Sequence, residues 1–164
     1  MNKFTDARLK YQQFIDGFPD HINVADAYYR VAVCFFEDSL KPAYDQERTL
    51  SAIDAFRNFL ERFPNDARYE DALNYIRRAQ YKLIEKKYQN GYIYYKMKDY
   101  SAALMYFEEV IELGNTDSLD RKSLYYSALL HLHQQNREAA DAAFNKLKSK
   151  YPGSAEARKL DRKF

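Results

Sequence analysis

A pattern of four residues that recurs along the chain constrains its fold more than any other feature. Each copy has an alanine, an aromatic or apolar residue four and seven positions later, and a proline twelve positions later. Three complete copies occur: Ala7, Tyr11, Phe14 and Pro19; Ala52, Phe56, Phe59 and Pro64; Ala140, Phe144, Leu147 and Pro152. Offsets of four and seven lie on one face of an α-helix, and proline cannot continue a helix. Each copy therefore predicts a helix that ends at a set position.

A fourth copy starts at Ala103 and shows what precedes these helices. Gly91, Tyr94 and Tyr100 lie twelve, nine and three residues before Ala103, and Asn115 stands where the proline would be. A small residue lets two helices approach closely, while aromatic side chains fill the groove beside it. This order of small, aromatic, aromatic and alanine resembles the tetratricopeptide repeat, a pair of helices.

Ala32 takes the small position ahead of Ala52, and Ala128, with His131 as its aromatic, takes it ahead of Ala140. The key alanines are spaced more widely than the about 34 residues of the standard repeat. We place the surplus in an insert near Pro42 and in one long helix. The helices predicted from the pattern are residues 5–17, 23–37, 46–62, 68–97, 100–113, 118–133, 136–150 and 154–162. We expect an all-α, right-handed solenoid of antiparallel helix pairs, with residues 1–164 as a single tetratricopeptide-repeat domain.

Composition narrows the function. The 26 Lys and Arg residues against 24 Asp and Glu residues give a net charge of only +2, which argues against a nucleic-acid partner. The N-terminus resembles no signal peptide, and no stretch approaches the ~18 apolar residues of a membrane span. Cys34, the single cysteine, lies in an apolar helical stretch and is expected to be a buried core residue.

No group of residues predicts catalysis, a cofactor or a metal. His131 and His133 are two residues apart, so on a helix they point in different directions and cannot share one metal ion. The adjacent Glu108 and Glu109 also diverge and have no partner in a recognisable motif, so we expect them to face solvent. The sequence therefore predicts a protein that is not an enzyme, with no catalytic, cofactor-binding or metal-binding residues.

The long helix is basic. Between Arg68 and Lys98 there are eight basic and three acidic residues, a local balance of +5. Arg77, Arg78 and Lys82 are our candidates for contacts with an acidic partner. The alternative interpretation is a solvated helix face.

The repeat register also predicts which side chains face the groove of each repeat. They are Tyr29, Phe36 and Glu37, then Glu85, Tyr88, Tyr92, Tyr95 and Lys96, and finally Lys122, Tyr125, Leu129, Leu132 and His133. Tyrosine is a common anchor at protein interfaces because it combines an apolar ring with a polar tip. The alternative is that these aromatics pack between neighbouring repeats.

Several segments resemble one particular family. They are FIDGFPDH at 14–21, AYYR at 27–30, YDQ at 44–46, LIE at 83–85 and YSAA at 100–103. In this order they are similar to the BamD family, also called YfiO or ComL, of outer-membrane assembly lipoproteins from Gram-negative bacteria. The resemblance extends over nearly the whole chain, and the insert with Asp45 and Gln46 is more specific than the repeat itself.

The resemblance implies a scaffold at the periplasmic face of the outer membrane. Such a scaffold docks on the POTRA region of the barrel-forming subunit, works with the other Bam lipoproteins and helps to insert β-barrels. The family carries a signal peptide, a lipidated cysteine and further repeats, whereas this sequence begins in the second helix of a repeat. We therefore expect the lipid anchor and N-terminal repeats in a segment missing from this sequence. The alternative function is a general tetratricopeptide adaptor that captures a partner peptide in its groove.

Overall fold

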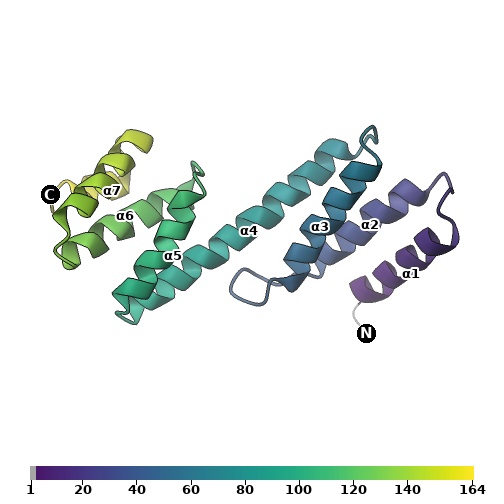
Figure 1. Ribbon diagram of the computed structural model, residues 1–164, viewed down its shortest axis with the longest axis horizontal. Coiled ribbons are helices and arrows are strands. Elements are labelled where there is room, and N and C mark those ends of the chain that lie inside the picture. The colour runs from purple at the N-terminus through teal and green to yellow at the C-terminus, as the bar shows by residue number, and fades with distance from the viewer. Residues whose placement is uncertain (1–2) are drawn as a thin grey trace. The chain divides into compact units, whose positions relative to one another are not determined.

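The computed structural model describes residues 3–164, and this part of the chain is helical without any β-strand (Figure 1). The helices are α1 (Lys3–Gly17), α2 (Val24–Glu37), α3 (Glu47–Arg62), α4 (Tyr69–Lys96), α5 (Tyr100–Glu112), α6 (Ser118–His133), α7 (Arg137–Lys150) and α8 (Ala155–Leu160). Each begins and ends within two residues of the range predicted from the repeat pattern. The all-α fold of tetratricopeptide-like helix pairs is therefore confirmed.

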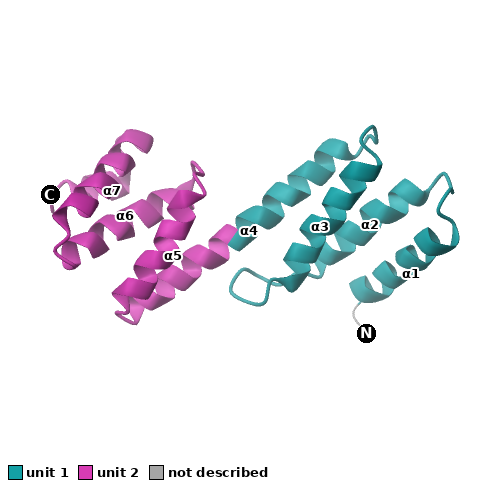
Figure 2. Cartoon of the chain, viewed as in Figure 1, with its two compact units in different colours: residues 1–83 teal, residues 84–164 magenta. Residues whose placement is uncertain are grey.

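The chain divides into two compact units within α4, between Leu83 and Ile84 (Figure 2). Unit 1 contains α1, α2, α3 and the first part of α4. Unit 2 contains the rest of α4 and α5 to α8. Each unit has its own hydrophobic cores.

The main core of unit 1 is built from the predicted repeat positions. Ala52, Phe56 and Phe59 of α3 are fully buried. The ring of Phe56 stacks on Tyr75 of α4 with centroids 4.9 Å apart, next to the fully buried Ala72 of the same helix. The small side chain of Ala72 lets α4 approach α3, and the aromatic rings fill the space that this leaves.

The insert between α2 and α3 is organised by Gln46, which is buried. Its Nε2 donates hydrogen bonds to the carbonyl oxygens of Lys41 (2.8 Å) and Tyr44 (3.1 Å), and its Oε1 accepts one from Thr49 Oγ1 at 2.7 Å. Asp45 Oδ1 accepts a hydrogen bond from the backbone N–H of Glu47 at 3.0 Å. Asp45 and Gln46 thus serve the fold, because they close the loop and satisfy polar groups at the start of α3.

In unit 2 the same packing places α5 against the second part of α4. Ala103, Phe107 and Val110 are fully buried. A Cβ atom on Gly91 would lie 3.1 Å from two ring carbons of Phe107 and 3.1 Å from Cβ of Tyr106. The predicted close contact of Gly91 with the helix of Ala103 is therefore confirmed.

A buried ion pair joins α6 to the end of α7. Asp120 is fully buried, and its Oδ2 accepts hydrogen bonds from Lys150 Nζ at 2.7 Å and from the hydroxyl of Tyr151 at 2.6 Å. Burial, followed by the hydrogen bond to Asp120, raises the pKa of Tyr151. The repeat pattern did not predict this pair, because its members lie about thirty residues apart.

Candidate partner-binding site

Seven of the predicted partner-binding residues lie in two side-chain clusters, one in each unit: Phe36, Arg78 and Lys82 in unit 1, and Tyr88, Tyr92, Tyr95 and Tyr125 in unit 2. The Phe36 cluster of unit 1 consists of Phe36, Tyr75, Arg78 and Lys82. The tyrosine cluster of unit 2 consists of Tyr88, Tyr92, Tyr95, Tyr100, Tyr125 and Tyr126. Each cluster lies within one compact unit.

In the Phe36 cluster, cationic groups cover an aromatic pair. The ring of Phe36 meets Tyr75 edge-on at 5.0 Å. The guanidinium of Arg78 lies 4.8 Å from the Phe36 centroid and 5.2 Å from that of Tyr75. At these distances a cation is attracted by the face of an aromatic ring. Arg78 is exposed, so its outer side remains open to a partner.

Lys82 is tied down within unit 1. Its Nζ donates hydrogen bonds to Ser39 Oγ at 2.6 Å and to the Ser39 carbonyl oxygen at 3.3 Å. Partial burial lowers the pKa of the Lys82 ammonium, and the charge of Glu37 opposes that shift. The sequence grouped Lys82 with Arg77 and Arg78 as an exposed partner contact, but in the structure Lys82 holds the start of the insert against α4.

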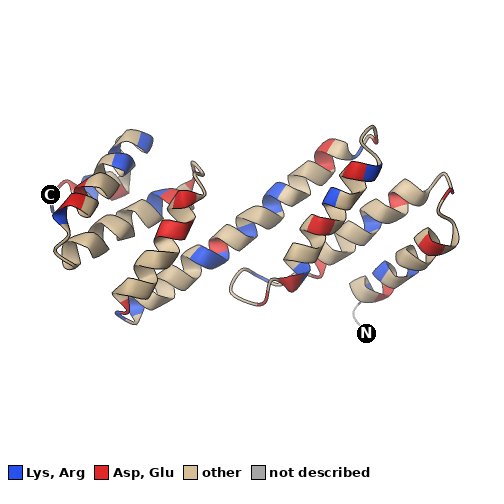
Figure 3. Ribbon diagram, viewed as in Figure 1, with Lys and Arg blue, Asp and Glu red and all other residues tan. Residues whose placement is uncertain are grey.

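Acidic side chains of the same unit neutralise part of the positive charge of residues 68–98. Arg68 pairs with Asp26 of α2 and, at 2.8 Å, with Asp66. Lys87 pairs with Glu109 of α5. Figure 3 shows these charges along the helices. The count of +5 for residues 68–98 treated all eight cations alike, because Asp26, Asp66 and Glu109, the acids that pair with Arg68 and Lys87, lie outside that range of the sequence.

Arg77 remains largely exposed. Its side chain is 65% accessible, and it lies 3.9 Å from a carboxylate oxygen of Glu70, which is 82% accessible. An exposed pair at this distance contributes little to stability. Arg77 and, in unit 2, the exposed Lys96 are therefore cations that a partner could reach.

Tyr29 does not line an open groove. It is only 9% exposed, its ring lies 5.4 Å from Phe59 and 5.9 Å from Phe56, and its hydroxyl donates a hydrogen bond to Asp71. Burial and this hydrogen bond raise the pKa of Tyr29. The register placed Tyr29 on the groove side, but α3 and α4 close over it, so Tyr29 belongs to the core.

In the tyrosine cluster, the aromatic rings of α4 contact one another and the ring of Tyr126 on α6. Tyr92 stacks between Tyr88, at 6.4 Å, and Tyr95, at 6.3 Å. Tyr126 of α6 contacts Tyr92 at 5.7 Å and Tyr95 at 4.8 Å, and it stacks on the buried Phe107 at 5.1 Å. Aromatic pairs at these separations stabilise beyond the area that they bury.

Tyr126 is the central residue of this cluster, and the sequence interpretation missed it in favour of Tyr125. The signal was present, because Tyr126 lies seven residues after Leu119 and four before Leu130, both of which are buried. That helical spacing puts Tyr126 on the side of α6 that meets α5. Burial raises the pKa of Tyr126, and the neighbouring tyrosines add to the shift.

The outer edge of the cluster is accessible. Tyr92 is 38% exposed. Tyr88 is half-buried, and this burial raises its pKa to about 12, with a smaller contribution from Tyr92. His133 meets the ring of Tyr100 edge-on at 4.5 Å, and Lys122 Nζ lies 5.9 Å from the Tyr88 ring. Rigid rings with polar tips on an accessible edge suit the binding of a protein surface.

The other predicted groove positions are distributed between surface and core. Glu37 is exposed, Glu85 accepts a hydrogen bond from Gln89 at 3.3 Å, and Leu129 packs against the core of α6, α7 and α8. Leu132 is half-buried. These four residues do not add a second accessible cluster.

Glu108 is exposed, as expected, and it also lies next to His131 of α6. His131 Nε2 lies 3.3 Å from Glu108 Oε1. His133 packs on Tyr100 instead, so the two histidines have separate partners. Within residues 3–164, no three His, Cys, Asp or Glu side chains are arranged to hold a metal ion. No helix in the same range has the length and apolar character needed to cross a membrane.

These features define a class of protein: a tetratricopeptide-repeat protein with aromatic side chains on its surface. Residues 122–154 match the model of a tetratricopeptide repeat. Residues 1–116 match the model of the YfiO family, described as an outer membrane lipoprotein. Because this match spans more than half of the chain, the chain belongs to the YfiO family of outer membrane lipoproteins.

Two curated relatives bear the name outer membrane protein assembly factor BamD. The protein from Caulobacter vibrioides is 30% identical over 124 residues, which cover 76% of this chain and 41% of the relative. The protein from Rickettsia prowazekii is 32% identical over 112 residues, which cover 68% of this chain and 45% of the relative. The resemblance stated from the sequence is confirmed, and the chain spans less than half the length of either relative.

Proposed function

We propose that this chain is a non-enzymatic scaffold subunit of the outer-membrane β-barrel assembly machinery. In this proposal it acts at the periplasmic face of the outer membrane. There it binds the POTRA region of the barrel-forming subunit, with other lipoproteins of the machinery as further partners. The observation that carries the proposal is the match of residues 1–116 to the outer membrane lipoprotein family. The names of the two relatives as assembly factors support it.

The tyrosine cluster is the contact that we propose for the POTRA region. Tyr92 presents an accessible ring, and Tyr88 and Tyr95 hold that ring by stacking from both sides. A ring held in place loses little conformational entropy on binding, which favours affinity. Arg77 and Lys96 would act through long-range attraction to acidic residues and not as central anchors.

The test is the affinity of a purified POTRA-containing partner for two matched variants. Tyr92→Ala should weaken binding by roughly 10- to 30-fold, the range for loss of a central aromatic anchor. Tyr81→Ala is the control, because Tyr81 is 40% exposed on the same helix and lies outside the cluster. Its affinity should stay within about twofold of the wild type, since peripheral residues contribute little.

Two results would count against the proposal in different ways. If the wild-type chain fails to bind the POTRA region, the assembly function is rejected. If the wild type binds but Tyr92→Ala and Tyr81→Ala bind equally well, the function stands and the tyrosine cluster is rejected as the contact.

The second candidate is a general adaptor that captures a partner peptide, and the match of residues 122–154 to a tetratricopeptide repeat favours it. This candidate predicts that the tyrosine cluster binds a short peptide in the absence of any POTRA region. Loss of peptide binding in Tyr92→Ala, together with a wild type that ignores the POTRA region, would support the adaptor over the assembly scaffold.

A further inference from the structure

One side of α4 is covered in its first part and open in its second part. Residues eighteen positions apart lie on the same side of a helix, because about 3.6 residues make one turn. Four such pairs occur: Ala72 and Asn90, Tyr75 and Ile93, Ile76 and Tyr94, Ala79 and Met97. Ala72 and Ala79 are fully buried, and Tyr75 stacks on Phe56 of α3. Ile93, by contrast, is 54% exposed, and Met97 is 69% exposed.

The reason is the difference in length between the two helices. The 16 residues of α3 extend about 24 Å and the 28 residues of α4 about 42 Å, at about 1.5 Å per residue. The core that α3 shares with α4 accordingly contains Ala72, Ile76 and Ala79 of the first part. In the second part α5 packs on another side, where Gly91 faces Phe107. Within residues 3–164, Ile93 and Met97 are therefore left without a covering helix.

The open side of α4 forms a hollow of about 270 Å³ in unit 2, which we call the Ile93 hollow. It is lined by Asn90, Ile93, Tyr94, Met97 and, from α5, Tyr106. The rings of Tyr94 and Tyr106 stack with their centroids 5.6 Å apart. The side-chain amide of Asn90 forms no hydrogen bond within residues 3–164, so it is available to a ligand. Apolar walls with one polar group are typical of a binding site.

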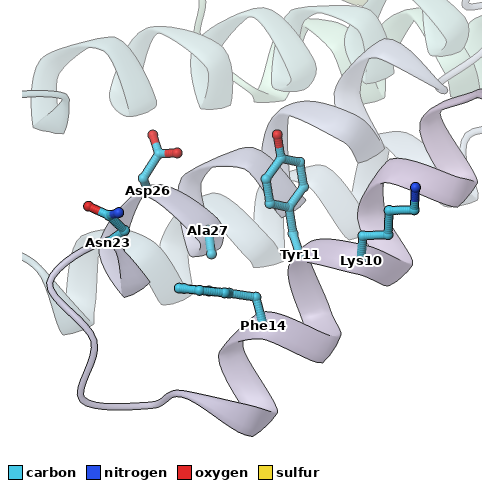
Figure 4. A pocket seen from close by; sticks show the side chains of 6 residues that line it. All are labelled: Lys10, Tyr11, Phe14, Asn23, Asp26 and Ala27. Atoms are coloured by element: carbon cyan, nitrogen blue, oxygen red, sulfur yellow. The ribbon is translucent and has the colours of Figure 1, made fainter.

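The hollow between α1 and α2 has a different origin. Figure 4 shows the rings of Tyr11 and Phe14 rising there from α1 toward α2. The family resemblance implies further repeats before this sequence, and a helix of such a repeat would pack next to α1. The Ile93 hollow does not depend on a helix of that kind, because residues 90–106 lie in the middle of the sequence and α3 is too short to reach them.

We propose that the Ile93 hollow docks an amphipathic helix of a partner polypeptide, which places an aromatic side chain over Ile93. The chemistry of this helix follows from α3, which covers the same side of α4 five turns earlier. Phe56 of α3 stacks on Tyr75, the residue equivalent to Ile93, and Ile53 lies one turn away in the same core. The docked helix therefore carries an aromatic residue and, three positions before it, an apolar one, which is the spacing of a helix in a groove.

Charge at the edge of the hollow favours an acidic partner. Lys96 and Lys98, on either side of Met97 in the sequence, are both exposed. The carboxylate of Asp99 is engaged at the start of α5, where it accepts a hydrogen bond from the backbone N–H of Ala102 at 3.2 Å. A second copy docked through the same face would add its own lysines to this edge, and like charges repel. The partner helix therefore has Asp or Glu near the lysines, as α3 has Glu47 in its first turn.

This docking site is separate from the tyrosine cluster, so it stands or falls without the proposed POTRA binding. Asn90 follows Tyr88 by two positions, which turns its side chain about 200° around the helix. The two sites therefore lie on different sides of α4, and a variant can remove one without the other.

The test uses the full chain and a fluorescently labelled synthetic peptide with the sequence of residues 47–62, that is, of α3. Fluorescence anisotropy should show saturable binding. Ile93→Glu should weaken it by roughly tenfold or more, because a charge would be buried under the aromatic ring. Leu113→Glu is the matched control and should stay within about twofold of the wild type. Leu113 is 51% exposed and lies about 10 Å along α5 from Tyr106.

Ile93 and Leu113 are both exposed, so both variants should retain the circular dichroism of the wild type. A peptide in which Phe56 is replaced by alanine should bind at least roughly tenfold more weakly, because it lacks the aromatic anchor. Tyr92→Ala should bind the peptide as tightly as the wild type does.

Three results would overturn the proposal. One is the absence of saturable binding by the wild type. Another is a loss of affinity in Leu113→Glu or in Tyr92→Ala that equals the loss in Ile93→Glu, because the peptide would then bind elsewhere. The third is a wild-type dimer that Ile93→Glu converts to a monomer, because a second copy would then occupy the hollow.

Discussion

Gly91→Leu tests the contact between α4 and α5, on which the packing of unit 2 depends. A Cβ atom at this position would lie 3.1 Å from Phe107 Cδ1 and Cε1 and from Tyr106 Cβ, whereas carbon atoms pack best at about 3.5–4.0 Å. Phe107 cannot move aside easily, because it is fully buried and stacked on Tyr126. Overpacking of this kind costs about 1–3 kcal/mol.

A compensating term must be considered. Replacing glycine within a helix gains up to about 0.8–1 kcal/mol of helix propensity. Leucine, however, adds three further carbon atoms beyond the Cβ that already clashes. We therefore expect the overpacking to win and the free energy of unfolding to fall by about 1–3 kcal/mol.

The control is Gly17→Leu at the end of α1. A Cβ on Gly17 would meet no atom within 4 Å, so this variant should change the free energy of unfolding by no more than about 0.5 kcal/mol. The assay is urea unfolding followed by circular dichroism at the helix band. Equal stabilities for Gly91→Leu, Gly17→Leu and the wild type would refute the close-contact reasoning and the repeat register on which it rests.

The same unfolding curves test whether residues 1–164 behave as a single domain, which remains a prediction. A loss of about 1 kcal/mol lowers the melting temperature by about 4–8 °C for a unit of 60–100 residues and by about 2–4 °C for one of 150–250 residues. A single cooperative transition shifted by Gly91→Leu would support one domain. Two transitions, of which only one shifts, would favour two units that unfold independently.

Two further predictions concern single side chains. Hydrogen bonds from Arg68 lower the pKa of Asp66 from 3.8 to about 2. The ionised carboxylate therefore stabilises the fold above about pH 4, by at most about 2 kcal/mol. We expect this contribution to disappear as the pH falls toward 2. In Asp66→Asn the free energy of unfolding should depend less on pH between about 4 and 2. The same pH dependence as in the wild type would contradict this role of Asp66. Cys34 is buried, and burial raises the pKa of its thiol. A thiol reagent should therefore modify Cys34 roughly 100-fold faster in denaturant than in the native state. Equal rates would place the thiol at the surface.

The predicted site was harder to obtain from the sequence than the predicted helices. The register identified Tyr88, Tyr92 and Tyr95, and the structure brings them into one stacked row. It could not identify Tyr126 as the residue that joins this row to α6, because that depends on how two helices rotate against each other. It also assigned Tyr29 to the groove, because the closure of α3 and α4 over that ring is not visible in helical spacing.

The sequence by itself determined where the helices lie and which faces they bury, because helical period, small residues and the helix-ending prolines act over a few residues. Only the tertiary structure decided which polar and charged side chains remain available. Lys82 bonds to Ser39 and Arg68 to Asp26, partners that lie more than forty residues away in the sequence. Such pairs depend on the packing of helices that are distant in sequence, and no local pattern specifies that packing.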